Sequence, residues 1–150
     1  MPPKILFVCT GNTCRSPMAE GLLKKMARDN GWLVETQSAG LAAFKGIPAA
    51  HEAVEVCREK GIDISGHQSQ PLSKTLVFES NWIITMTQRH KEAILRRVPD
   101  LMAKVILLSE FAGQGEVDVE DPVGQSVEEY RNVFNQIEGY LSKAKERLSS

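Results

Sequence analysis

The chain has 150 residues, of which 42% are hydrophobic and 25% charged, which suits one domain that folds without a metal or a disulfide. Its 18 basic and 19 acidic side chains leave a formal net charge of −1, so no basic field favours nucleic acid or an anionic membrane as a partner. No apolar stretch approaches the roughly 20 residues of a membrane span, and the start MPPKILFVC has no secretory signal pattern. We therefore expect a single domain over residues 1–150, located in the cytoplasm, with its three cysteines reduced.

Apolar runs alternate along the chain with stretches whose apolar residues recur at helical spacing. In chain order, this pattern predicts a strand at residues 4–9, a helix at 17–30, a strand at 32–38, a helix at 49–60, a short helix after residue 73, a strand at 81–86, a helix at 88–97, a strand at 104–108, a loop at 109–124 and a helix at 126–148. The first helix has clear boundary signals, with Ser16 as the expected N-cap, Pro17 at the first position and Gly31 just past the end.

The alternation of strands and helices predicts the fold class. We expect an α/β three-layer sandwich, in which a four-stranded parallel sheet with right-handed crossovers is flanked by helices on both faces. Ligands of such sheets bind beyond the carboxyl ends of the strands. The segment CTGNTCRSP, residues 9–17, follows the first strand and is therefore the predicted functional site.

This segment combines an anion-binding loop with a nucleophile. A turn from a strand into a helix directs several backbone N–H groups at one small space, and Gly11 and Asn12 tolerate the positive φ that such a loop needs. The guanidinium of Arg15 offers paired donors to phosphoryl oxygens. The thiol of Cys9, in this positive field and within reach of the Ser16 hydroxyl, is expected to ionise readily and to attack a bound phosphate.

Other interpretations of the segment have less support. A lone cysteine at the end of a strand is more often an inert core residue, and the bare spacing C-x5-R occurs often by chance. Cys9 and Cys14 form a C-x4-C pair, but no second pair of cysteine or histidine follows at zinc-ligand spacing, so we expect no metal and no cofactor. The pattern G-x4-G-K-[ST] of nucleotide hydrolases is also absent.

The motif VCTGNTCRSPMAE resembles the low-molecular-weight protein tyrosine phosphatases. The resemblance extends over essentially the whole chain and includes SAG at residues 38–40, GI at 61–62, His67 and DP at 121–122. It implies a phosphotyrosine phosphatase I-like fold and a cysteine-dependent protein phosphatase that works through a phosphocysteine intermediate.

The resemblance also implies catalytic roles for three residues. Cys9 would be the nucleophile, and Arg15 would bind the phosphate and stabilise the transition state. Asp121 would protonate the leaving atom as a general acid and then activate water as a base. An Asp-Pro pair alone usually marks a turn, but this one lies in a long loop that could fold over the site.

The other matching residues would form and support the phosphate-binding loop. Ser16 would hydrogen-bond the thiolate, and Asn12 would keep the loop in shape through a polar network with Ser38 and His67. The loop itself would comprise Thr10, Gly11, Asn12, Thr13, Cys14, Arg15 and Ser16.

Two roles remain open for Cys14, which could pack beneath the loop or form a reversible disulfide with oxidised Cys9. Cys57 shares a helix face with apolar residues and is predicted to lie in the core. His51 and His90 are interpreted as surface residues of their helices.

Residues near the loop favour phosphoarginine over phosphotyrosine as the phosphorylated side chain of the protein substrate. Tyrosine-specific relatives commonly have a bulky aliphatic residue where this chain has Thr13, and tyrosines where it has Val123 and Gly124. A small hydroxyl-bearing residue suits a planar, polar guanidinium, and these features resemble the bacterial protein arginine phosphatases. Phe44 is expected at the rim, where it could stack on either leaving group. A tyrosine phosphatase of the same family remains the alternative.

Two other functions have less support from the sequence. A thiol-dependent arsenate reductase would need another cysteine pair, whereas only Cys57 lies outside the loop. A non-catalytic phosphopeptide-binding module would have little use for the nucleophile Cys9 or the acid Asp121. Inorganic phosphate, arsenate and vanadate are expected to compete for the loop.

Overall fold

Four parallel strands form the centre of the computed structural model, which describes residues 2–149. The strands are β1 (Lys4–Cys9), β2 (Glu35–Gly40), β3 (Trp82–Thr85) and β4 (Val105–Leu107), and they lie in the order β2-β1-β3-β4. In this register Cys9 lies opposite Gly40, so both residues are at the carboxyl edge of the sheet. The predicted four-stranded parallel sheet is confirmed.

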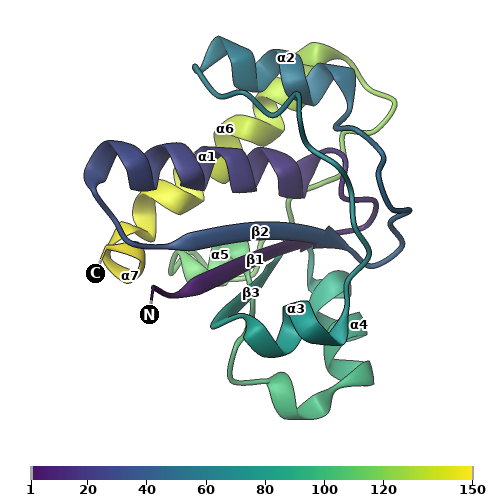
Figure 1. The fold of residues 1–150 in the computed structure, drawn as a ribbon, viewed down its shortest axis with the longest axis vertical. Coiled ribbons are helices and arrows are strands. Elements are labelled where there is room, and N and C mark those ends of the chain that lie inside the picture. The colour runs from purple at the N-terminus through teal and green to yellow at the C-terminus, as the bar shows by residue number, and fades with distance from the viewer. Residues whose placement is uncertain (1, 150) are drawn as a thin grey trace.

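Helices cover both faces of this sheet. They are α1 (Arg15–Asn30), α2 (His51–Glu59), α3 (Lys74–Glu79), α4 (Gln88–Arg97), the 3₁₀ turn η1 (Pro99–Leu101), α5 (Leu108–Phe111), α6 (Val127–Lys143) and α7 (Lys145–Leu148). Helices α1, α2 and α6 lie on one side of the sheet, and α3 and α4 lie on the other (Figure 1). The arrangement is the predicted three-layer sandwich. Within residues 2–149, no helix combines the length and the apolar character that a membrane span requires.

The alternation of side chains along β1 divides the core between the two faces. Ile5, Phe7 and Cys9 belong to the larger apolar cluster, which includes residues of α1 and α6. Leu6 and Val8 belong to the smaller cluster, which includes residues of α3 and α4. Because successive side chains of a strand point to opposite faces, the same alternation directs the Cys9 thiol toward the α1 side.

The first helix begins earlier than the sequence predicts. Its N-cap is Cys14 instead of Ser16, so Pro17 lies at the third helical position, still within the first turn where a missing N–H is tolerated. The predicted C-terminal signal is confirmed, because Gly31 adopts a left-handed conformation with φ of 68°. The early start matters because it places the Arg15 side chain on a regular helix.

Three other boundaries also differ from the prediction. The second strand runs over Glu35–Gly40 and not over 32–38, and the first three residues of the predicted loop at 109–124 belong to the short helix α5, which ends at Phe111. The predicted long C-terminal helix is interrupted at Ala144, which separates α6 from α7. The break at Ala144 is attributed to tertiary packing, since the sequence has no Gly or Pro there.

Candidate active site

The loop between β1 and α1 turns its backbone carbonyl groups outward. The carbonyl oxygens of the loop accept hydrogen bonds as follows: Cys9 from Leu41 N–H (3.0 Å), Thr10 from Ala42 N–H (2.9 Å), Asn12 from the ring of His67 (2.7 Å) and Thr13 from Ala50 N–H (2.8 Å). Within residues 2–149, the N–H groups of residues 11–14 donate to no other protein atom. Because a peptide N–H points opposite to the carbonyl of the preceding residue, the N–H groups of Gly11, Thr13 and Cys14 face the interior of the loop.

The start of α1 adds further donors to this interior. Helices α3, α4 and α6 each begin with a serine or threonine whose side chain accepts from a first-turn N–H group. Helix α1 has no such side-chain cap. Its first-turn amides and the positive end of its dipole are therefore available to an anion in the loop.

Gly40 allows the loop to lie close against β2. A Cβ atom at this position would lie 2.5 Å from the carbonyl oxygen of Thr10 and 3.0 Å from the backbone nitrogen of Asn12. Both contacts are with backbone atoms, which cannot move without distorting the loop. The glycine of the SAG motif is therefore required by the close approach of two backbone segments.

Asn12 maintains the shape of the loop through both its backbone and its side chain. Its φ of 57° is the one positive value among the non-glycine residues of the described chain. The side-chain Oδ1 accepts from Gln70 N–H at 2.9 Å, which fixes the orientation of the amide. Its Nδ2 group then donates to the hydroxyls of Ser16 at 2.8 Å and Ser38 at 2.9 Å. The predicted contact of Asn12 with Ser38 is thus present, and His67 binds its carbonyl.

The same network determines what the Ser16 hydroxyl offers to Cys9. Because Ser16 Oγ accepts from Asn12, its own hydrogen is available to the Cys9 sulfur, which lies 2.9 Å away. A hydrogen bond of this direction stabilises the ionised form of a thiol. Both residues are buried.

Glu20 extends the network through a hydrogen bond with Ser38, a contact that the sequence did not predict. Its Oε1 accepts from the Ser38 hydroxyl at 2.5 Å, and its Oε2 pairs with Lys24 at 2.6 Å. The i, i+4 spacing of Glu20 and Lys24 on α1 was visible in the sequence, but the link to Ser38 depends on the packing of α1 against β2.

Arg15 is buried with one donor unused. Its Nη1 donates to the carbonyl of Val119 at 2.9 Å, and its Nη2 lies 3.5 Å from Asp121 Oδ2. The side chain is only 3% exposed, and yet its Nε–H group has no hydrogen-bond acceptor within residues 2–149. An unpaired buried donor on a cation is costly and is the signature of a site that awaits an anion.

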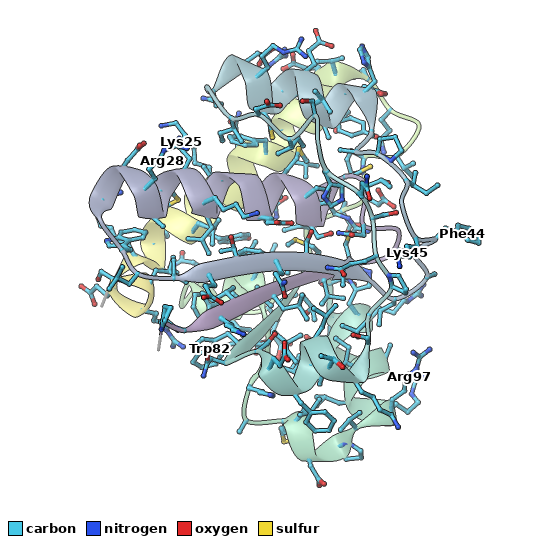
Figure 2. All side chains as sticks on the ribbon, in the orientation of Figure 1. Lys25, Arg28, Phe44, Lys45, Trp82 and Arg97 are labelled. Carbon is cyan, nitrogen blue, oxygen red and sulfur yellow. The ribbon has the colours of Figure 1, made fainter. Side chains whose placement is uncertain are left out.

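The loop opens into a cavity of about 160 Å³, and the acid predicted from the sequence lies at its mouth. The lining residues are Cys9, Thr10, Gly11, Thr13, Cys14, Arg15, Asp121 and Val123. Asp121 is 40% exposed, and its Oδ1 accepts from Val123 N–H at 3.1 Å. Phe44 is 80% exposed, does not line this cavity and projects from the edge of the molecule (Figure 2).

Cys14 and Cys57 are both buried thiols. Burial raises the pKa of Cys14, even though hydrogen bonds from Tyr130 and Thr13 act in the opposite direction. The Cys14 sulfur lies 3.3 Å from the Tyr130 hydroxyl, which α6 contributes. Burial alone raises the pKa of Cys57 to about 12, and this residue lies in the core as predicted.

The interpretation of His90 as a surface residue is wrong. Its side chain is buried, and its Nε2 lies 2.9 Å from the Thr10 hydroxyl of the phosphate-binding loop. Burial lowers the pKa of His90 to about 4, and the positive charge of Arg15 acts in the same direction. His51, in contrast, is exposed as predicted. The signal that could have found His90 is its place three residues after Thr87, the N-cap of α4.

The arrangement of Cys9, Arg15 and the inward-facing amides could bind a phosphate beside a thiol, and comparisons with known proteins identify the family. The model of the low molecular weight phosphotyrosine protein phosphatases matches residues 4–150. The chain belongs to this family, and it is a phosphatase.

The relatives of this chain include both protein-arginine and protein-tyrosine phosphatases. The chain is 38% identical to a protein-arginine-phosphatase of Geobacillus stearothermophilus, over 100% of this chain and 99% of that protein. It is also 38% identical to the tyrosine phosphatase PtpB of Staphylococcus haemolyticus, over 89% of this chain and 91% of that protein. A solved structure of the arginine phosphatase YwlE, a variant with a phosphorylated active-site serine, has a TM-score of 0.93 at 37% identity and covers 97% of this chain and 95% of that one.

Proposed function

We propose that this phosphatase removes the phosphoryl group from phosphoarginine in proteins, with Cys9 as the nucleophile. The Cys9 thiolate attacks phosphorus, the phosphorus–nitrogen bond breaks, and its electron pair goes to the guanidine nitrogen, which takes a proton from Asp121. The products of this step are free arginine side chain and phosphorylated Cys9. Water then attacks phosphorus and gives a proton to Asp121, which releases inorganic phosphate and restores the thiolate.

The unpaired, buried Nε–H of Arg15 is the observation that carries the proposal. Arg15 lines the same cavity as Cys9, together with Gly11, Thr13 and Cys14, whose amides face inward. A tetrahedral anion with several oxygens matches these donors, and the same donors would stabilise the charge of a pentacoordinate transition state. Phosphate, arsenate and vanadate are therefore expected to compete with substrate.

The cavity walls support arginine over tyrosine as the leaving group. None of its lining residues is aromatic, so the ring of phosphotyrosine would find no aromatic wall there. Thr13 contributes a hydroxyl to the lining, and Val123 stands at the mouth with 63% of its surface exposed. The full-length similarity to a protein-arginine-phosphatase supports the same choice.

Paired kinetics on phosphoarginine and phosphotyrosine peptides test the substrate class. We expect wild type to have the higher kcat/KM on phosphoarginine, and Thr13→Ile to shift the ratio toward phosphotyrosine by about 10-fold or more. Thr75→Ile, which changes an exposed threonine of α3, is the matched control and should leave the ratio unchanged. A wild-type preference for phosphotyrosine that Thr13→Ile does not alter would favour the tyrosine alternative.

Two further observations separate this proposal from other functions of the same loop. Trapping of a phosphorylated Cys9 in a single turnover distinguishes an enzyme from a phosphopeptide-binding module. Arsenate reduction through a relayed disulfide would need another accessible thiol, whereas Cys57 is 0% exposed. We propose a location in the cytoplasm, with which three free cysteines are consistent.

A further inference from the structure

The side chains of His90 and Thr10 form a polar pair at the phosphate-binding loop. Thr10 was predicted only as a member of this loop, and the reaction scheme above gives no role to its hydroxyl or to His90. His90 is in the first turn of α4, and Thr10 directly follows the nucleophile. His90 is 6% exposed, while Thr10 is exposed and belongs to the cavity lining. The pair therefore connects a helix terminus with the substrate cavity.

Hydrogen-bond directions within this pair are fixed by a backbone donor. The N–H of Thr87 donates to His90 Nδ1 at 3.2 Å, and a backbone N–H cannot accept. A neutral imidazole that accepts at Nδ1 must have its hydrogen on Nε2. His90 Nε2 therefore donates to Thr10 Oγ1 at 2.9 Å.

The consequence concerns the hydrogen of the Thr10 hydroxyl. Its oxygen already accepts from His90, so the hydroxyl hydrogen is turned away from the ring, and no protein acceptor for it exists within residues 2–149. Thr10 is exposed and lines the cavity, so a phosphoryl oxygen bound in the cavity can replace water as the acceptor of this hydrogen. A hydroxyl that already accepts one hydrogen bond is also a better donor in the next.

We propose that Thr10 is a further substrate-binding residue, whose hydroxyl donates to a phosphoryl oxygen, and that His90 is the positioning residue that sets the direction of this donor. The inference rests on the proposed function, because it assumes that the cavity binds a phosphoryl group. A phosphoryl oxygen accepts hydrogen bonds, whereas a guanidinium only donates, so a donor at Thr10 matches the phosphate and not the leaving group. Thr10 would thus add affinity for phosphate, while Thr13 influences the choice of leaving group.

Two substitutions at His90 separate its contacts. Asn at this position places an acceptor near the position of Nδ1, so His90→Asn retains the hydrogen bond from Thr87 but cannot reach Thr10. Gln places an N–H near the position of Nε2, so His90→Gln retains the donor to Thr10. Thr10→Val removes the hydroxyl with little change in shape, and Thr10→Ser retains it.

The experiment measures the dissociation constant of inorganic phosphate by calorimetry for each variant. Thr10→Val and His90→Asn should each weaken binding, by about 10-fold for Thr10→Val, while Thr10→Ser and His90→Gln should stay within about twofold of wild type. In the Thr10→Val background, His90→Asn should cause no further loss, because the two residues act through one hydroxyl. Wild-type affinity in Thr10→Val, or losses that add in the double variant, would overturn the inference.

Controls distinguish this role from a structural one. Ser73→Ala removes the N-cap of α3, which accepts from Leu76 N–H, and should lower stability without changing phosphate affinity. His90→Asn changes a residue of the α4 cap and could fail to fold. Thr10→Val changes no helix cap, so the phosphate affinity of this variant tests the proposal by itself. Phosphate binding is measured without any protein substrate, so a failure of the arginine assignment in the peptide kinetics would not be mistaken for a failure of the Thr10 contact.

Discussion

The two loops that meet at the cavity differ in how firmly they are fixed. In the phosphate-binding loop, Asn12 and Ser16 are fully buried and Arg15 nearly so, and the outward carbonyl groups are bonded to neighbouring segments. In the loop that carries Asp121, the acid is 40% exposed, and Val123 N–H and Gln125 N–H make only short-range bonds within the same turn. The first loop is bonded to neighbouring segments along its length, whereas the second is anchored at Val119, which is bonded to Arg15 and Met86, and makes only local backbone hydrogen bonds after Asp121.

This difference divides the work of the enzyme. Donors that are already aligned need no reorganisation when the anion binds or when charge develops in the transition state. A loop that admits a protein side chain and then covers it belongs to the less stable part of a fold. We therefore expect binding of phosphate to depend on the first loop and transfer of the proton to depend on the second.

Cys9→Ser tests the first loop most severely. Loss of the sulfur nucleophile should reduce kcat by roughly 10⁴-fold or more, because a serine hydroxyl is not ionised in this site. Phosphate affinity should remain near that of wild type, since the amides and Arg15 are unchanged. Steady-state kinetics and calorimetry measure the two quantities, and Cys57→Ala, a core variant, should lower stability but retain turnover.

Asp121→Asn tests whether the second loop supplies the proton for the leaving group. An amide cannot donate the proton to the leaving group, so kcat should fall by about 10²- to 10³-fold, most for substrates with poor leaving groups. Phosphate affinity should not fall, because the neighbouring negative charge is removed. Glu120→Gln, at an exposed position next to it, is the control. A loss of similar size in Glu120→Gln would mean that charge in the loop, and not proton transfer, is what matters.

The smallest expected effect is a loss of stability in acid. His90 faces Arg15, Asp118 and Asp121, and burial keeps its pKa at about 4 in the folded state, compared with 6.5 when it is unfolded. Its folded pKa is lowered, so the unfolded chain binds a proton first, and stability falls as pH drops from 6.5 toward 4.

The size of this loss is up to about 3 kcal/mol, since each pKa unit corresponds to about 1.4 kcal/mol. Urea unfolding of wild type and His90→Asn at pH 7, 5.5 and 4.5 measures it, because other titrating groups are common to both proteins. If the two free energies of unfolding fell in parallel over this range, His90 would not be the group responsible.

The sequence predicted those features whose causes are local. The run KILFVC is apolar on both faces of a buried strand, and the following segment has the residue types of an anion loop, so the sheet and the phosphate-binding loop could be anticipated. Gly31 likewise ends α1 for a local reason, its left-handed conformation. The resemblance to a known family then extended the prediction to Ser38 and His67, which do contact the loop.

Features that depend on packing could not be anticipated in the same way. His90 has a charged neighbour on each side along α4, RHK, and its burial follows from the packing of that helix against β3 and β4 and from its contact with Thr10. Tyr130 contacts Cys14 over 116 positions of the chain, and the Val119 carbonyl binds Arg15 over 104 positions. The spacing of apolar residues within one helix or strand does not predict contacts between residues so far apart in the sequence.

Position 12 tolerates almost no residue other than asparagine. Its backbone conformation is one that glycine adopts most easily, whereas the three hydrogen bonds of its side chain require an amide. Glycine would satisfy the turn and remove the network, and glutamine would offer an amide of the wrong length on a backbone that it tolerates poorly. We therefore expect asparagine to be nearly invariant at this position, even between relatives that act on different substrates.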